Sequence, residues 1–113
     1  MNKHAVIQQY FSAWNTRNAD KLTELFAENS SLIDWEIDVA GRDNVIAANA
    51  NIWEAVPDIH VLVQKIATDD STGTGYGIIT VTSKEQNLHL PVLDVFVFDD
   101  NNKITRVSAY KQQ

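Results

Sequence analysis

The first half of the chain repeats its hydrophobic residues with the period of an α-helix. In residues 3–16, apolar side chains recur at steps of three, four and seven, which puts them on one helix face. They are Val6, Ile7, Tyr10, Phe11 and Trp14. Asn18 can cap a second, short helix over residues 19–27. The same spacing over residues 43–55 predicts a third helix, which Pro57 ends.

The second half changes to short apolar segments that are rich in β-branched residues and separated by polar turns, a pattern typical of strands. One earlier strand and four later ones are predicted, over residues 30–35, 59–68, 74–83, 88–98 and 103–111. Residues 36–41 are expected to form a loop. Because the helices come first and sequential strands come last, the order indicates an α+β fold, with an antiparallel, curved sheet and helices packed on one face.

The longest predicted strand, residues 88–98, has an acid among apolar side chains. Alternation along a strand gives two faces. One face carries Leu88, Leu90, Val92, Asp94, Phe96 and Phe98; the other carries His89, Pro91, Leu93, Val95 and Val97. Both are largely apolar, so both should be covered. If helices cover the first, a homodimer is the simplest cover for the second.

Charge and composition exclude several classes of function. With 113 residues, the chain is expected to be one domain, residues 1–113, and its net charge of -6 with no Lys/Arg cluster disfavours nucleic acid and anionic membranes as partners. There is no cysteine, which excludes disulfides and Cys-based zinc sites. The histidines at positions 4, 60 and 89 lack metal-ligand spacing. The glycines of residues 73–77 lack the Lys and the helix of a phosphate loop, and are expected to mark a bend or bulge. We therefore expect neither a metal nor a cofactor.

The N-terminus does not have the features of a targeting segment. Its first ten residues contain no uninterrupted apolar stretch of the kind found in signal peptides. No segment approaches the roughly 20 apolar residues of a membrane helix. A cytoplasmic protein without membrane contact is the expectation.

Three polar side chains lie on apolar faces of separate predicted elements: Tyr10, Asp34 and Asp94. Each has an ordinary interpretation when taken alone. Tyr10 suits a core tyrosine with its hydroxyl at the rim, Asp34 suits a strand end, and Asp94 could reach water beside a bulge near Pro91. Taken together, the three should face one cavity, which favours a functional site.

Several segments resemble the NTF2-like superfamily, in the branch that contains the SnoaL-like proteins and the ketosteroid isomerases. The resemblance covers nearly the whole chain, through residues 6–15 (VIQQYFSAWN), 25–28 (LFAE), 32–34 (LID), 41–44 (GRDN), 53–58 (WEAVPD) and 93–98 (LDVFVF). It implies a cone, in which a curved, mostly antiparallel sheet wraps three helices around a deep apolar pocket. It also implies a homodimer, which is usual in the family.

The resemblance implies roles for individual residues. Ketosteroid isomerases use an Asp base, with a Tyr and a protonated Asp as the oxyanion hole. Tyr10 and Asp94 match the two oxyanion-hole groups, and Asp34 matches the base. Some isomerases have, on the third helix, a tyrosine that bonds the catalytic tyrosine; Asn49 stands at that position here. The residues expected to bind substrate are Trp14, Asn49, Trp53, Val92, Phe96 and Phe98. Trp35 could also shape a pocket for a flat ligand, although core packing explains the tryptophans equally well.

Two hypotheses follow. The leading one is an isomerase-type or cyclase-type enzyme that moves a proton next to the carbonyl of an apolar small molecule. It requires Asp34 to be ionised and Asp94 to be neutral at neutral pH. The alternative is a non-catalytic module that uses the same cone to bind a small molecule or to dimerise.

Overall fold

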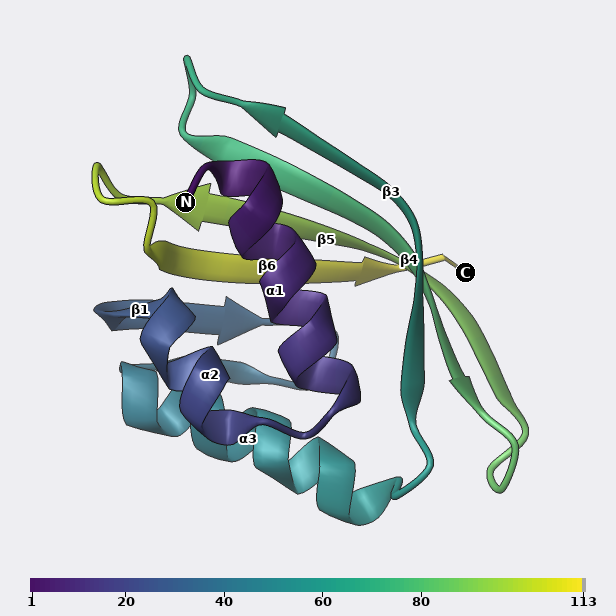
Figure 1. Cartoon of the computed structure of the whole chain (residues 1–113). Coiled ribbons are helices and arrows are strands. Elements are labelled where there is room, and N and C mark those ends of the chain that lie inside the picture. The colour runs from purple at the N-terminus through teal and green to yellow at the C-terminus, as the bar shows by residue number, and fades with distance from the viewer. Residues whose placement is uncertain (113) are drawn as a thin grey trace.

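Three helices lie against one side of a six-stranded sheet in the computed structural model, which describes residues 1–112 (Figure 1). The helices are α1 (Lys3–Asn15), α2 (Ala19–Leu25) and α3 (Arg42–Ala55). The strands are β1 (Phe26–Ile33), β2 (Asp38–Ala40), β3 (His60–Asp69), β4 (Thr74–Ser83), β5 (Leu88–Phe98) and β6 (Ile104–Lys111).

The sheet is mixed and strongly curved. Its order is β2-β1-β6-β5-β4-β3, and every neighbouring pair is antiparallel except β1 and β6, which are parallel. The strands bend around α1, while α3 runs along the other end of the sheet beside β1 and β2 (Figure 1). The predicted α+β architecture, a mostly antiparallel curved sheet around three helices, is confirmed.

The segment around β1 differs from the prediction in three ways: the second helix is shorter, β1 runs over Phe26–Ile33 instead of residues 30–35, and the strand β2 is added. The second helix ends at Leu25, and β1 begins at Phe26 rather than at residue 30, because Phe26 already pairs with Ile104 of β6. Residues 38–40, expected to be loop, form the short strand β2 opposite the end of β1. The early start of β1 and the strand β2 both depend on pairing with another strand, which local hydrophobic periodicity cannot predict.

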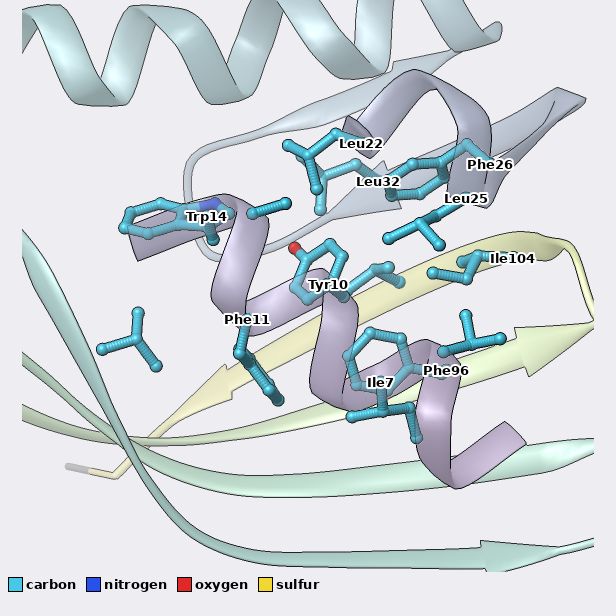
Figure 2. Close-up of a cluster of buried hydrophobic side chains, with 14 of the residues drawn as sticks. Ile7, Tyr10, Phe11, Trp14, Leu22, Leu25, Phe26, Leu32, Phe96 and Ile104 are labelled. Atoms are coloured by element: carbon cyan, nitrogen blue, oxygen red, sulfur yellow. The ribbon is translucent and has the colours of Figure 1, made fainter. Parts of the chain in front are cut away.

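Two glycines of β4 let helix α1 approach the sheet closely. A Cβ atom at Gly77 would lie 2.8 Å from the Phe11 ring, and one at Gly75 would lie 2.5 Å from Ile7 Cδ1. Of the bend or bulge expected for residues 73–77, the turn is found at Gly73, which has φ 69° just before β4, whereas Gly75 and Gly77 pair regularly with β5 and form no bulge. Their role is to accommodate the apolar stripe of α1, which forms the centre of the core (Figure 2).

The outer face of the sheet is apolar and exposed. Along β5 the inward residues from Val92 to Phe98 are buried, whereas Leu93 between them is 37% exposed. Ile78 and Tyr110 pair with Leu93 from the two neighbouring strands and are 48% and 59% exposed. The chain itself therefore covers only one of the two apolar faces that the sequence predicts.

Candidate active site

A cavity of about 160 Å³ lies between α1, α3 and the concave face of the sheet. Most of its lining is apolar, from residues such as Phe11, Leu32, Val61 and Val92. The side chains in the lining that carry a polar group are few: Tyr10, Trp14, Asp34, Trp35, Asn49 and Asp94. The cavity thus has the form of a small-molecule site, an apolar space with a small number of convergent polar groups. It brings together the three residues that the sequence singled out from three separate elements.

Tyr10 lies in the centre of the core on α1. It is only 4% exposed, and its ring makes edge-to-face contacts with Phe11, Phe26 and Phe96 at centroid distances of 5.2, 6.0 and 5.1 Å. Figure 2 shows the ring enclosed by these apolar side chains. Burial, followed by the nearby charges of Asp94 and Asp34, raises the pKa of the phenol well above its ordinary value. Tyr10 is therefore a neutral phenol that can donate a hydrogen bond.

Asp94 lies in the middle of β5, with its side chain on the concave face. Its neighbours across the ladder are Gly77 and Ala109, and the pairing with β4 is regular along the whole strand, so no bulge carries Asp94 toward water. Its side chain is buried, at 6% exposure. Burial, and secondly the charge of Asp34, raise the pKa of the Asp94 carboxyl to about 7. Below that pH the carboxyl is mostly protonated and can act as a donor.

Asp34 directly follows the last residue of β1 and is partly exposed, so it lies nearer to solvent than the other two. Its Oδ1 atom accepts hydrogen bonds from the backbone N–H groups of Glu36 and Ile37, at 2.7 and 2.6 Å. These bonds fix the turn between β1 and β2, as an aspartate at the start of a turn commonly does. Among the described residues, Oδ2 accepts no hydrogen bond, which leaves this oxygen available to a ligand.

Within residues 1–112, no side-chain hydrogen bond is found for the Tyr10 hydroxyl or the Asp94 carboxyl, and the polar ends of both side chains open on the cavity instead of being sealed in the core. Buried polar groups in folded proteins almost always have a partner, from protein, water or ligand. Two such groups that line one apolar cavity are therefore placed to bind a hydrogen-bond acceptor that enters it.

Asn49 does not support Tyr10. Its Oδ1 accepts a hydrogen bond from Trp14 Nε1 at 2.9 Å, and its Nδ2 donates to the carbonyl oxygen of Val45 at 2.8 Å. The first bond joins α1 to α3 and holds the Trp14 indole in the cavity wall, and the second, within α3, fixes the Asn49 amide. The position of the tyrosine found in some isomerases is thus used here to fix a wall residue.

The other predicted substrate-binding residues divide into two groups. Trp14, Asn49 and Val92 line the cavity. Trp53, Phe96 and Phe98 are not among its lining residues: Trp53 packs edge-on against Trp14 at 5.7 Å, and Phe96 and Phe98 stack on each other in the closed part of the core at 6.4 Å. Their placement supports a packing role behind the wall.

Trp35, which the sequence suggested could shape the pocket although it was not among the predicted substrate-binding residues, does line the cavity and is 40% exposed. It follows Asp34, and its ring lies 5.4 Å from Lys111 Nζ at the end of β6. Alternation along β1 assigns Trp35 to the face opposite Asp34, but the strand ends at Ile33, so the assignment does not apply. Because β1 ends before Trp35, this side chain lies in the cavity wall and not on the opposite face of the sheet.

No group of three or more His, Asp or Glu residues within residues 1–112 is arranged to hold a metal ion. None of the helices in this part of the chain is long and apolar enough to cross a membrane.

Comparison with known structures gives the same cone. Bal32a, from a soil-derived mobile gene cassette, superposes with a TM-score of 0.89 at 19% identity, over 99% of this chain and 93% of that one. A candidate isomerase of the SnoaL-like family from Agrobacterium tumefaciens gives 0.82 at 18% identity over 100% of both chains. A candidate polyketide cyclase from Sinorhizobium meliloti gives 0.83 at 16% identity over 93% of both. At these identities the likeness shows the fold alone.

Sequence comparison assigns the family. A search of curated proteins gives no significant match. The profile of the SnoaL-like domain, in contrast, matches residues 7–107, which include most of α1 and the residues Tyr10, Asp34 and Asp94. The cone, its cavity and this match together show that the chain belongs to the SnoaL-like family.

Proposed function

We propose that this protein is an enzyme that transfers a proton next to the carbonyl group of an uncharged, apolar small molecule, as an isomerase or a cyclase. One observation carries the proposal. A single apolar cavity holds a carboxylate near solvent, Asp34, and two buried groups, Tyr10 and Asp94, without hydrogen-bond partners within the described residues. This set is what enolate chemistry needs.

The two buried groups are suited to bind a carbonyl oxygen. Burial keeps the Tyr10 phenol neutral, and it keeps the Asp94 carboxyl largely protonated below pH 7. Each can then donate one hydrogen bond to the same oxygen. When negative charge develops on that oxygen, preorganised donors in a water-poor site stabilise it more than water does.

The carboxylate of Asp34 is suited to act as the base. It takes the proton from the carbon next to the carbonyl, and the electron pair of that C–H bond moves to the carbonyl oxygen. In an isomerisation the same proton returns to a different carbon, which shifts a double bond. In a cyclisation the enolate carbon attacks a second carbonyl carbon of the same molecule, and the new alkoxide takes the proton. Both reactions balance without a co-reactant.

The observation that supports the alternative, a binding module without chemistry, is the extent of the apolar lining. A turnover assay separates the enzyme from the binding module. We expect Asp34→Asn to abolish nearly all proton transfer, because an amide cannot accept the proton, and Asp94→Asn to keep part of it, because an amide still donates. Asp38→Asn, an exposed carboxylate on β2, is the matched control. Ligand binding that all variants retain, without turnover in the native protein, would support the module instead.

We also propose that two copies pair through the outer sheet face. Ile78, Leu93 and Tyr110 form one row across three strands, and all three are exposed. Adjacent exposed apolar residues on a sheet commonly mark an interface, and a twofold pair would cover the row on both copies.

A further inference from the structure

We infer that the site takes an uncharged cyclic ketone or enone of about one ring, and that Trp35 sets this size limit. The inference rests on the proposed function for the role of the carbonyl group. It goes further in naming the size and charge of the compound. Three features of the cavity carry it: its volume, the charges in its lining and the position of the Trp35 indole.

Volume restricts the ligand first. The cavity holds about 160 Å³. An engineered apolar cavity of ~150 Å³ in another protein binds benzene, whereas sites for drug-sized ligands run from roughly 300 to 1,000 Å³. A six-membered ring with one oxygen therefore fills the space between Tyr10 and the mouth. A second fused ring has to leave through the mouth.

Charge restricts the ligand next. The lining contains two carboxyl groups, Asp34 and Asp94, and no Lys, Arg or His among its described residues. Lys111 Nζ lies over the Trp35 ring, but Lys111 does not line the cavity. A carboxylate ligand would meet the Asp34 charge without a cation inside to compensate. At a separation of ~6 Å and an effective dielectric constant of about 20, this repulsion weakens binding on the order of 100-fold.

Trp35 is a lining residue in a position to limit a larger ligand, because it reaches from the cavity to solvent. It is the lining side chain that follows Asp34, and at 40% exposure it reaches solvent, whereas Tyr10 at 4% and Asp94 at 6% mark the deep end. Its place is held from two sides. The bonds from Asp34 Oδ1 to the next turn fix the backbone, and Lys111 Nζ lies 5.4 Å from the ring centroid. The indole is thus a wall against which the distal edge of a ring can pack.

Binding of four probes tests the inference by NMR titration of the native protein. The probes are cyclohex-2-enone (one ring, neutral), a bicyclic octalone, a four-ring steroid enone, and cyclohex-1-ene carboxylate (one ring, anionic). We expect the monocyclic enone to bind at least tenfold tighter than the bicyclic and steroid enones, and the carboxylate to bind on the order of 100-fold more weakly.

Truncation of the wall tests the role of Trp35. Trp35→Ala should reduce the ratio of the affinities for the monocyclic and bicyclic enones at least fivefold. Trp35→Phe, which keeps a flat ring, should preserve most of that affinity ratio. Because Trp35 is partly exposed and lies outside the core, both variants should fold, which amide spectra of the free proteins check.

The binding results test the proposed ligand class separately from the proposed catalysis. Equal or tighter binding of the steroid enone, equal binding of the carboxylate, or no binding of cyclohex-2-enone overturns the inference. An affinity ratio that is unchanged in Trp35→Ala overturns the inference that Trp35 sets the size limit. Turnover is measured separately with cyclohex-3-enone. Selective binding of the monocyclic enone without turnover refutes the enzyme and supports the proposed ligand class. Turnover of a steroid enone in preference to the monocyclic one supports the enzyme and refutes the proposed ligand class.

Discussion

Replacing Asp94 by asparagine should change how the stability of the protein depends on pH. In the native protein the pKa of this carboxyl is about 7, because it is buried and because the Asp34 charge is near. In the unfolded chain an aspartate has a pKa of ~3.9. A raised pKa in the folded state means that the folded protein binds this proton more tightly than the unfolded chain does. The stability that Asp94 contributes is therefore complete below about pH 4 and is lost as the pH rises through 7.

The size of the effect follows from the difference between the two pKa values. That difference is about three pH units, and each unit corresponds to ~1.4 kcal/mol. Between pH 4 and pH 8, the free energy of unfolding of the native protein should fall by about 4 kcal/mol relative to Asp94→Asn. Near pH 4 the two proteins should be similar in stability, because both carry an uncharged, polar side chain. At pH 8 the variant should be clearly the more stable.

Urea unfolding of both proteins from pH 4 to pH 8 measures this difference, and subtraction removes the groups that titrate alike in both. Carboxyl-carbon NMR of Asp94 gives its pKa independently. In Asp34→Asn we expect that pKa to fall, since one of its two causes is removed. Stability curves that run parallel over the whole range, together with an Asp94 carboxyl that titrates near 4, would refute the reasoning.

Three further predictions concern packing and assembly. Gly77→Ala should destabilise the fold by about 1–3 kcal/mol in urea unfolding, because the new Cβ would lie 2.8 Å from the rigid Phe11 ring; an unchanged midpoint would contradict this close approach. Trp14→Phe should cost about 1–3 kcal/mol by the same assay, because it leaves the buried Asn49 Oδ1 without its donor, and a neutral effect would argue that water replaces the bond. Leu93→Glu should convert a dimer to a monomer in sedimentation at micromolar concentration, and a native protein that is already monomeric would contradict the proposed outer-face pairing.

Much of the fold could be predicted from the sequence because its main elements are amphipathic. The stripe that includes Tyr10 and Trp14 marks α1 through its 3.6-residue period, and alternation along β5 separates Asp94 from Leu93 on opposite faces, as the structure confirms. The cavity also brings Tyr10, Asp34 and Asp94 together. An acid or phenol on an otherwise apolar face is conspicuous in a sequence, because such a placement is costly without a purpose.

The remaining features depend on contacts between distant segments. The partner of Asn49 depends on where the fold places α3 relative to α1, which makes it Trp14 and not Tyr10. The early end of β1 at Ile33 turns Trp35 into a cavity residue, and Phe96 belongs to the closed part of the core although it shares a face with Asp94. A hydrophobic pattern gives the face on which a residue lies, but not how deep along that face the cavity extends.

Exchange of the protons next to a carbonyl is the measurement that tests the proposed chemistry most directly. A monocyclic ketone in D₂O is followed by proton NMR with the native protein, Asp34→Asn, Asp94→Asn and the control Asp38→Asn. The account predicts exchange well above the buffer rate in the native protein and the control. It predicts near-background exchange in Asp34→Asn, and a loss on the order of 10² to 10³ in Asp94→Asn, as for a lost oxyanion donor. Exchange at the buffer rate in the native protein, or exchange that Asp34→Asn leaves unchanged, would contradict it.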